Sequence, residues 1–298
     1  MRLFGFWSEA TLAILLVVFV FSSANAEISV IDDSGHRVIL SAPAQRIVSL
    51  APHATELLFD AGAGKKVIGV SSGSDYPAQA SQLPSAGNSA RLDMERITLL
   101  KPDLIVAWAS GNNPRQIAQL RKQGYAVFES EPRRFEDIAT TLERLATLAG
   151  STQGRDAAAD FRQALVVLSK RYQGRTPVSV FYQIWPSPLM TLNGQHLVSQ
   201  ALMLCGATNV FGGLTQLAPT VSREAVVSVN PDAILVSDET DGFERWNKLA
   251  SLKAVRQQHL FKVNGKQLNR PTPRMLAAMS DLCEQIDIVR KHRPIATP

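Results

Sequence analysis

A short segment of this chain occurs twice, and the repeat limits the folds that are open to it. Residues 95–106 read ERITLLKPDLIV, and residues 224–235 read EAVVSVNPDAIL. The glutamate, proline, aspartate and isoleucine of the first copy recur 129 residues later. Each copy is typical of a short helix, a Pro-Asp turn and a buried strand. A unit repeated once, at about one domain length, predicts two similar lobes with a cleft between them.

The first 26 residues have the features of a secretory signal. Arg2 precedes an apolar run over 12–21, and the small residues Ala24-Asn25-Ala26 follow it, with no cysteine near the cut. This pattern predicts a signal peptide that is cleaved after Ala26, and a soluble periplasmic protein. A membrane anchor is the alternative, but the run is short against the ~20 residues that span a bilayer.

Charge and cysteines narrow the function classes further. The formal net charge is +5, and the basic residues are scattered rather than gathered on one face, which argues against nucleic-acid binding. Cys205 and Cys283 are an even pair in an oxidising compartment, which favours one disulfide over two buried free thiols. Closing this loop of 78 residues would stabilise the fold by roughly 4 kcal/mol.

Short apolar strands alternate with helices along the chain, which is typical of parallel α/β sheets. The predicted domains are the lobes 27–152 and 175–298, joined by one long helix within 153–174. Because a helical connector resists bending, we expect the lobes to move little. The expected strands are 46–50, 67–71, 104–108, 126–129, 178–183, 233–237 and 260–263. The expected helices are 55–61, 94–100, 114–123, 135–149, 157–172, 196–205, 223–229 and 273–289.

Catalytic and metal-binding motifs are missing from the sequence. It contains no G-x-S-x-G, no Walker loop and no G-x-G-x-x-G after a strand. Its five histidines form no H-x-x-x-H or H-E-x-x-H pair, and neither cysteine has a partner at zinc-ligand spacing. We therefore predict no enzyme and no metal site; a site assembled from distant residues, or a zinc or manganese binder, is the alternative.

Aromatic and polar side chains follow several of the predicted strands. His53, Tyr76, Trp108, Trp185 and Arg270 all lie at or just after a strand's carboxyl end. Ligands of open α/β sheets bind at those ends, so the set predicts a large, flat or partly apolar ligand. Ordinary packing beneath a loop is the alternative for each residue.

The repeated glutamates allow two interpretations. Glu95 and Glu224 each fall at a helix start, where a carboxylate stabilises the helix dipole by ~0.3–1 kcal/mol. The functional interpretation is that one carboxylate on each lobe offers a two-point contact to a basic partner.

Several segments resemble a known family. RIVSLAPHATELLFDAG, MERITLLKPDLIVAW and VSREAVVSVNPDAILV are similar to the periplasmic cobalamin-binding proteins of vitamin importers. More broadly, they resemble the helix-linked class of substrate-binding proteins, which also serves haem and ferric siderophores. The resemblance extends from about Arg46 to about Val289.

The resemblance implies a role for particular residues. It implies that Glu95 and Glu224 dock onto arginines of the membrane permease, and that Cys205 and Cys283 form the family's disulfide. The residues that it places at the corrinoid cleft are Pro52, His53, Tyr76 and Arg270, to which we add Trp108, Trp185 and Met190.

The pocket departs from the family's pattern. Gly73, Ser89 and Ala218 stand where an aromatic is expected, Met190 replaces a phenylalanine, and Trp185 is an aromatic that the familiar cobalamin binder lacks there. The expected function is capture of cobalamin or another corrinoid by a monomer, and its delivery to an ABC permease dimer with its ATPase; no cofactor is expected beyond the transported ligand. The same class binding haem or a ferric siderophore is the alternative, and His53 as a ligand to the cargo's metal stays open beside a histidine bonded to backbone.

Overall fold

The computed structural model describes residues 27–238 and 242–292 of the 298-residue chain. The predicted signal peptide, residues 1–26, lies outside the described residues. Among those that are described, no helix combines the length and the apolar character that a membrane crossing needs.

The first lobe is built on a parallel four-stranded sheet with the order β4-β3-β5-β6. These strands are Val67–Val70, Ile47–Ser49, Leu104–Trp108 and Val127–Ser130. Four helices alternate with them: α1 (Pro52–Asp60), α2 (Met94–Leu100), α3 (Pro114–Lys122) and α4 (Phe135–Ala149). Short 3-10 turns at Gly64–Lys66 and Ala78–Gln82 complete the connections.

The second lobe repeats this plan with a parallel sheet of order β10-β7-β11-β12. Its strands are Ala207–Asn209, Val178–Gln183, Ala233–Ser237 and Leu260–Val263. Its helices are α6 (Leu197–Leu204), α7 (Arg223–Val229), α8 (Phe243–Asn247), α9 (Lys253–Arg256), α10 (Gly265–Leu268) and α11 (Met275–Lys291). The predicted fold class, two parallel α/β lobes, is confirmed.

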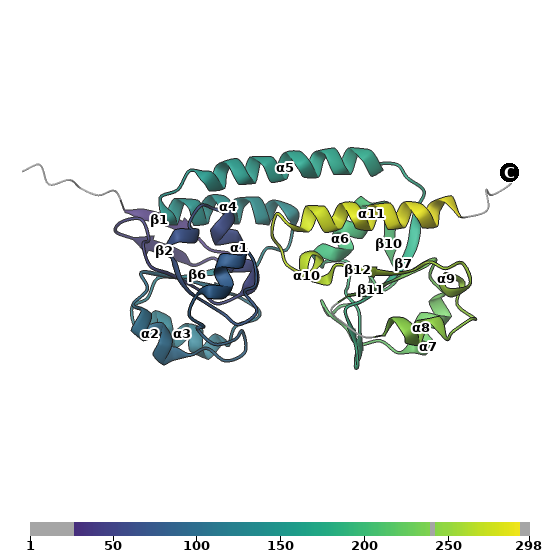
Figure 1. Ribbon diagram of the computed structural model, residues 1–298, viewed down its shortest axis with the longest axis horizontal. Helices are drawn as coiled ribbons and strands as arrows, with labels where there is room; N and C mark the ends of the chain where they lie inside the picture. The colour runs from purple at the N-terminus through teal and green to yellow at the C-terminus, as the bar shows by residue number, and fades with distance from the viewer. Residues whose placement is uncertain (1–26, 239–241, 293–298) are drawn as a thin grey trace, which may run out of the picture.

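One helix, α5 (Gln153–Tyr172), runs along the backs of both lobes (Figure 1). It packs on α1 and α4 of the first lobe and on α6 and α11 of the second. It lies within the predicted connector 153–174, although the domain boundaries themselves stay a prediction. Helices α2 and α3 of one lobe, and α7 and α8 of the other, lie at the ends away from α5 (Figure 1).

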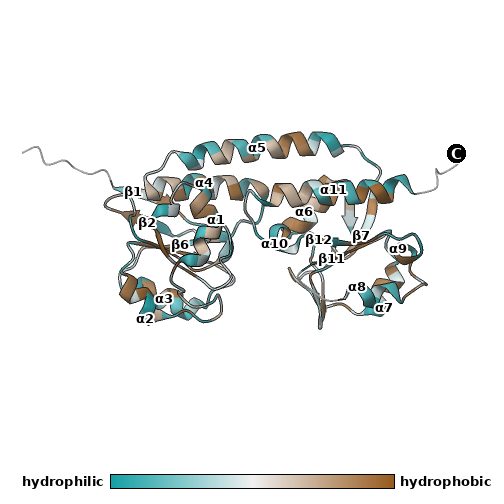
Figure 2. Cartoon of the chain, in the orientation of Figure 1, coloured by the Kyte–Doolittle hydropathy of each residue, from teal (hydrophilic) through white to brown (hydrophobic). Residues whose placement is uncertain are grey.

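Buried apolar side chains form a continuous core beneath α5. One cluster extends from Leu57 and Leu142 in the first lobe through Phe161 of α5 to Leu202 and Ile286 in the second. Figure 2 shows brown apolar residues along the strands and alternating brown and teal on α5, as expected for a helix with one buried face. Since the core is shared, a change of lobe orientation would disturb close-packed side chains.

The two copies of the repeat fold alike. Helices α2 and α7 have the predicted bounds, and each ends at a left-handed residue, Lys101 (φ 46°) or Asn230 (φ 44°). The aspartate of each Pro-Asp pair then bonds backbone at the neighbouring strand. Asp103 accepts from the amides of Gln45 and Arg46 at 2.7 and 3.0 Å, and Asp232 accepts from the amide of Ser179 at 2.9 Å. The repeated aspartate therefore has a structural role.

The disulfide between Cys205 and Cys283 is present, with the two Cα atoms 4.8 Å apart, which confirms that prediction. It ties the end of α6 to α11. Two antiparallel hairpins were not predicted: β1 (Ile28–Ile31) with β2 (Arg37–Leu40), and β8 (Trp185–Pro186) with β9 (Leu189–Met190). The bounds of α1 were also wrong, because Pro52 begins the helix at a position that suits proline, and His53 lies in its first turn rather than in a loop.

Candidate functional site

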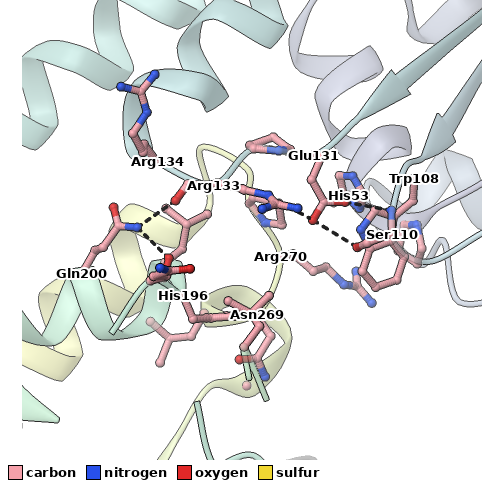
Figure 3. A pocket seen from close by; sticks show the side chains of 18 of the residues that line it. His53, Trp108, Ser110, Glu131, Arg133, Arg134, His196, Gln200, Asn269 and Arg270 are labelled. Atoms are coloured by element: carbon pink, nitrogen blue, oxygen red, sulfur yellow. Dashed lines mark hydrogen bonds and ion pairs between the residues drawn. The ribbon is translucent and has the colours of Figure 1, made fainter. Parts of the chain in front are cut away.

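A cavity of about 590 Å³ lies between the lobes, which is within the size range of ligand pockets. The first lobe contributes Pro52, His53, Trp108, Ser110, Glu131, Pro132, Arg133 and Arg134. The second contributes Gln195, His196, Leu197, Gln200, Leu217, Gly265, Lys266, Leu268, Asn269, Arg270 and Pro271. Figure 3 shows the two groups facing one another across this space.

The wall from the first lobe includes an aromatic surface beside its polar residues. His53 and Trp108 meet edge to face, with ring centroids 5.6 Å apart. Trp108 ends β5 and is half-buried, and Asn112 holds the turn that follows: its Oδ1 accepts from the Trp108 amide at 2.7 Å, and its Nδ2 donates to the carbonyl of Leu50 at 3.1 Å. A Cβ on Gly111 would lie 1.9 Å from the Trp108 ring, so only glycine lets the indole lie over this turn.

His53 is a neutral imidazole at the base of this wall. Its side chain is buried, and burial, together with the charge of Arg270, lowers its pKa to about 4, against a hydrogen bond with the Ser130 backbone that raises it. Its Nε2 is buried, and no hydrogen-bond partner for it lies among the described residues.

The wall from the second lobe is mostly polar. Gln200 of α6 crosses to the first lobe, where its Nε2 donates to the carbonyl of Arg133 at 2.7 Å (Figure 3). The His196 Nδ1 accepts from the Val198 amide at 3.1 Å and caps α6. Burial lowers the pKa of His196 to about 4, so it too is neutral. Asn269 accepts from the Tyr182 hydroxyl at 3.1 Å.

Arg270 lines the cavity, but its guanidinium is bonded to the first lobe. Its Nη1 lies 2.9 Å from Glu56 and 2.6 Å from Asp75. Burial alone would raise the pKa of Asp75, but the bonds from Arg270 and Lys266 hold it at about 2. The arginine predicted to contact a ligand is therefore also part of a contact between the lobes.

Pro52, His53, Trp108 and Arg270 are thus brought together, whereas three other predicted residues lie apart from the described lining of the cavity. Tyr76 lies under Arg274, whose guanidinium carbon is 3.6 Å from its ring centroid. Trp185 is 51% exposed on the β8-β9 hairpin, and Met190 pairs with it across the hairpin. Contact of these three with a ligand stays a prediction.

Glu95 and Glu224 are exposed in the first turns of α2 and α7, at the ends of the lobes away from α5 (Figure 1). The Glu224 carboxylate bonds its own backbone and the Ser222 hydroxyl, and these bonds lower its pKa. Both are therefore placed on one side of the molecule, outside the described lining of the cavity.

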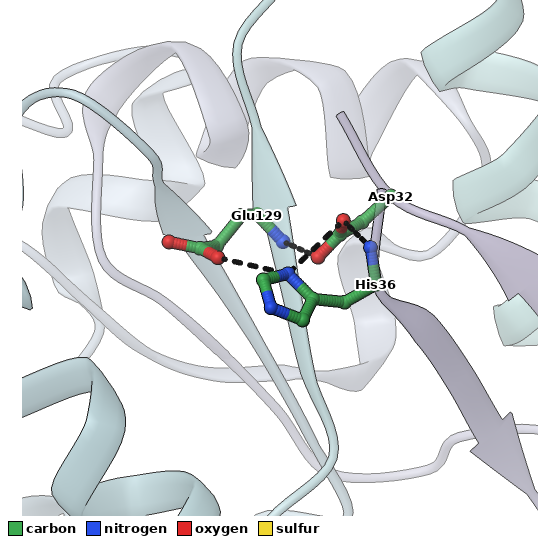
Figure 4. A group of neighbouring side chains, drawn as sticks. All are labelled: Asp32, His36 and Glu129. Carbon is green, nitrogen blue, oxygen red and sulfur yellow. Dashed lines mark hydrogen bonds and ion pairs between the residues drawn. The ribbon is translucent and has the colours of Figure 1, made fainter. Parts of the chain in front are cut away.

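Three side chains of the first lobe, Asp32, His36 and Glu129, lie close enough together to be possible metal ligands (Figure 4). Their carboxylates already have partners: Asp32 accepts from the amides of Ser34, His36 and Glu129, and Arg121 lies 2.7 Å from Glu129. These contacts are those of an ion-pair network that fixes the β1-β2 hairpin to β6.

Sequence reasoning missed many polar residues of the cavity lining, on both lobes. Glu131 to Arg134 follow β6, so the strand-end rule that selected Trp108 applies to them as well. Gln195 and Gln200 carried no such signal, because they lie on α6 and the loop before it rather than at a strand's end.

Comparison with known proteins identifies the relatives. The family model described as "Periplasmic binding protein" matches residues 47–265. The vitamin B12-binding protein of Vibrio cholerae is 39% identical over 254 residues, 84% of this chain and 91% of that protein. The vitamin B12-binding protein of Yersinia pestis is 36% identical over 252 residues, 83% of this chain and 89% of the relative.

Solved structures of periplasmic binding proteins resemble this chain as well. The crystal structure of the periplasmic vitamin B12-binding protein of Vibrio cholerae matches with a TM-score of 0.78 and covers 84% of this chain and 99% of its own. A periplasmic heme-binding protein from Roseiflexus sp. RS-1 matches with a TM-score of 0.73 at 24% identity, over 83% of this chain and 99% of its own, which shows a shared fold. The prediction of a binding protein rather than an enzyme is confirmed, because this chain belongs to the periplasmic binding protein family.

Proposed function

We propose that this protein captures vitamin B12, cobalamin, and delivers it to an ABC importer. The observation that carries the proposal is the inter-lobe cavity, with an aromatic surface from one lobe and polar side chains from both, in a chain 39% identical to a vitamin B12-binding protein over 84% of its length. A corrinoid offers both surfaces that such walls need: a flat macrocycle with apolar faces, and amide side chains around its rim.

The two walls suggest how the ligand lies. The face of the macrocycle would pack against Trp108, and the rim amides would exchange hydrogen bonds with Gln195, Gln200 and Asn269. A corrinoid is larger than the cavity, so the part that projects from it would reach Trp185 and Met190 on the β8-β9 hairpin and Tyr76 beside the cleft. In this arrangement Trp185 supplies aromatic surface to the ligand. It would compensate for Gly73 and Ser89, which stand where the family's pattern has aromatic residues.

His53 would form the base of the site rather than coordinate the metal of the ligand. Its Nε2 is buried, and the ring is packed edge-on against Trp108. A metal centre could reach that nitrogen only after the side chains that bury it had moved. The absorption spectrum of bound aquocobalamin tests this: the wild type and His53→Gln should give the same spectrum, and a wild-type band shift absent from the variant would contradict it.

Delivery would use the two exposed glutamates. Glu95 and Glu224 lie at the free ends of the two lobes, where a permease dimer could contact both through arginines. The route to this partner would begin with cleavage after Ala26 and release of the mature protein as a periplasmic monomer.

Calorimetric titration of the mature protein with cyanocobalamin tests the cargo. We expect saturable binding of one ligand per chain. Titration with hemin and with a ferric siderophore in parallel tests the alternatives, and mass spectrometry of ligand carried through purification identifies the natural cargo. Absence of saturable binding at micromolar cyanocobalamin would refute the assignment, and tighter binding of hemin would replace it.

A further inference from the structure

Among the described residues, a buried carboxylate of the first lobe takes all its side-chain donors from the second. Glu56 of α1 is only 1% exposed. Its Oε1 accepts from Arg270 Nη1 at 2.9 Å and from Arg274 Nη1 at 3.1 Å, and its Oε2 accepts from Thr272 Oγ1 at 2.9 Å. The three donors lie in or next to the short link between α10 and α11. We call these four residues the inter-lobe clasp.

Contacts of the loop after β4 extend the clasp. Asp75 accepts from Arg270 at 2.6 Å and from Lys266 Nζ at 2.9 Å. The Tyr76 ring lies under the Arg274 guanidinium. The link of the second lobe is thus held at two elements of the first, α1 and the loop that carries Asp75 and Tyr76.

Because Glu56 is buried, its stability in the fold depends on these contacts with the second lobe. A carboxylate removed from water is costly unless it is paired and hydrogen-bonded, and breaking a buried pair costs more than forming it gained. If the lobes separated, Glu56 would lose all three side-chain donors at once. Asp60 lies one turn further along α1 and is also partly removed from water. Burial and the charge of Glu56 raise the pKa of Asp60 to about 6.

The clasp is also part of the wall of the cleft. Arg270 and Pro271 line the cavity, and Thr272 follows them with its side chain fully buried. On the other side, Pro52 and His53 line the cavity from the same helix that carries Glu56. The distance between α1 and the link therefore sets the width of the cleft at its base.

We propose that Glu56 is a positioning residue that holds the two lobes at the separation needed for ligand capture before any ligand arrives. Its effect on cargo affinity rests on the proposed function, whereas its effect on the distance between the lobes does not.

The test measures that distance directly in the ligand-free protein. Gln119→Cys in α3 and Ser228→Cys in α7 place nitroxide spin labels on exposed positions near the free ends of the lobes, where a rotation gives the largest displacement. The native cysteines are joined in the disulfide and take no label. Pulsed electron-electron double resonance then compares the labelled parent with Glu56→Gln, which keeps the shape of the side chain and loses its charge.

We expect one narrow distance distribution for the parent and a broader or longer one for Glu56→Gln. Asp33→Asn is the matched control, because Asp33 pairs with Arg144 inside the first lobe, and it should keep the parent distribution. The distribution also predicts affinity: if nine-tenths of Glu56→Gln molecules lie outside the parent distance, cyanocobalamin affinity should fall about tenfold.

An unchanged distribution for folded Glu56→Gln would overturn the proposal. If that variant does not fold, Thr272→Val with Arg274→Gln removes two of the three donors and decides in its place by the same criterion. If the parent fails to bind cyanocobalamin, the proposed cargo is wrong, while the distance comparison still decides the role of Glu56.

Discussion

The two lobes share one supersecondary unit but present different walls to the cleft. In both, a capped short helix carries an exposed glutamate, ends at a left-handed residue and leads through Pro-Asp into a buried strand. The cleft walls do not repeat: His53 and Trp108 form an aromatic surface on one lobe, and Gln195, Gln200 and Asn269 a polar one on the other. What is repeated suits a partner with two-fold symmetry, and what is not repeated suits an asymmetric ligand.

The disulfide distinguishes the two lobes, because within the described residues it belongs to the second lobe alone. Cys205→Ala with Cys283→Ala should lower the free energy of unfolding by roughly 4 kcal/mol, since the bond closes a loop of 78 residues. Urea denaturation of the variant, and of the wild type with and without reductant, measures the loss. A change below about 1 kcal/mol would show that the second lobe does not depend on the bond.

The repeated aspartates give a matched pair of substitutions. Asp232 is 4% exposed and also pairs with Lys253, whereas Asp103 is exposed. Asp232→Ala should therefore cost about 2–3 kcal/mol of stability, because the half-buried Ser179 amide and Lys253 ammonium lose a buried carboxylate, and Asp103→Ala about 1 kcal/mol. Urea midpoints of the two variants test the order. Equal losses would mean that the two copies contribute alike despite their different burial.

Ligand affinity should depend more on the aromatic wall than on the polar one. Trp108→Ala should weaken cyanocobalamin binding by about 2 kcal/mol, roughly 30-fold, and Gln200→Ala by about 1 kcal/mol. Gly111→Ala should act in the same direction as Trp108→Ala, because its Cβ displaces the indole. Calorimetric titrations of the three variants decide. A larger loss of affinity for Gln200→Ala than for Trp108→Ala would show that binding depends more on the polar side chains than on the aromatic surface.

Each wall also contains a buried neutral histidine, and both histidines should make the stability of the fold decrease in acid. His53 and His196 have pKa values lowered from 6.5 to about 4, so the unfolded chain binds more protons as the pH falls below 6.5, and stability is lost between pH 6.5 and 4. Asp60, whose pKa is raised to about 6, opposes this trend. The net loss between pH 7 and pH 5 should be about 2 kcal/mol.

Urea unfolding across this pH range measures the effect, and His53→Gln should flatten the profile. A profile that His53→Gln leaves as steep as that of the wild type would show that this histidine is not the source.

The scaffold could be predicted because its signals are local. Apolar strands of four to six residues and the repeated Pro-Asp turns placed β5, β7, β11, β12, α2 and α7 with the bounds found in the structure. The β8-β9 hairpin could not be predicted, since strands of two residues carry too short a pattern.

The site was only partly visible in the sequence. The strand-end rule selected His53, Trp108 and Arg270, all of which line the cavity. Gln200 and Glu56 carried no signal, because the role of each depends on a contact with the other lobe, from Gln200 to Arg133 and from Glu56 to Arg270, across 67 and 214 residues of sequence. Pairings at such a separation are set by the packing of the two lobes and not by local pattern.

The proposed separation of partner-facing and ligand-facing residues is tested most directly by one double variant. Glu95→Ala with Glu224→Ala should leave the affinity for cyanocobalamin unchanged, because neither residue belongs to the described lining of the cavity, and should weaken uptake in cells or in vesicles that contain the permease. Wild-type uptake by the double variant would contradict the account, as would a loss of uptake that is explained by weaker ligand binding.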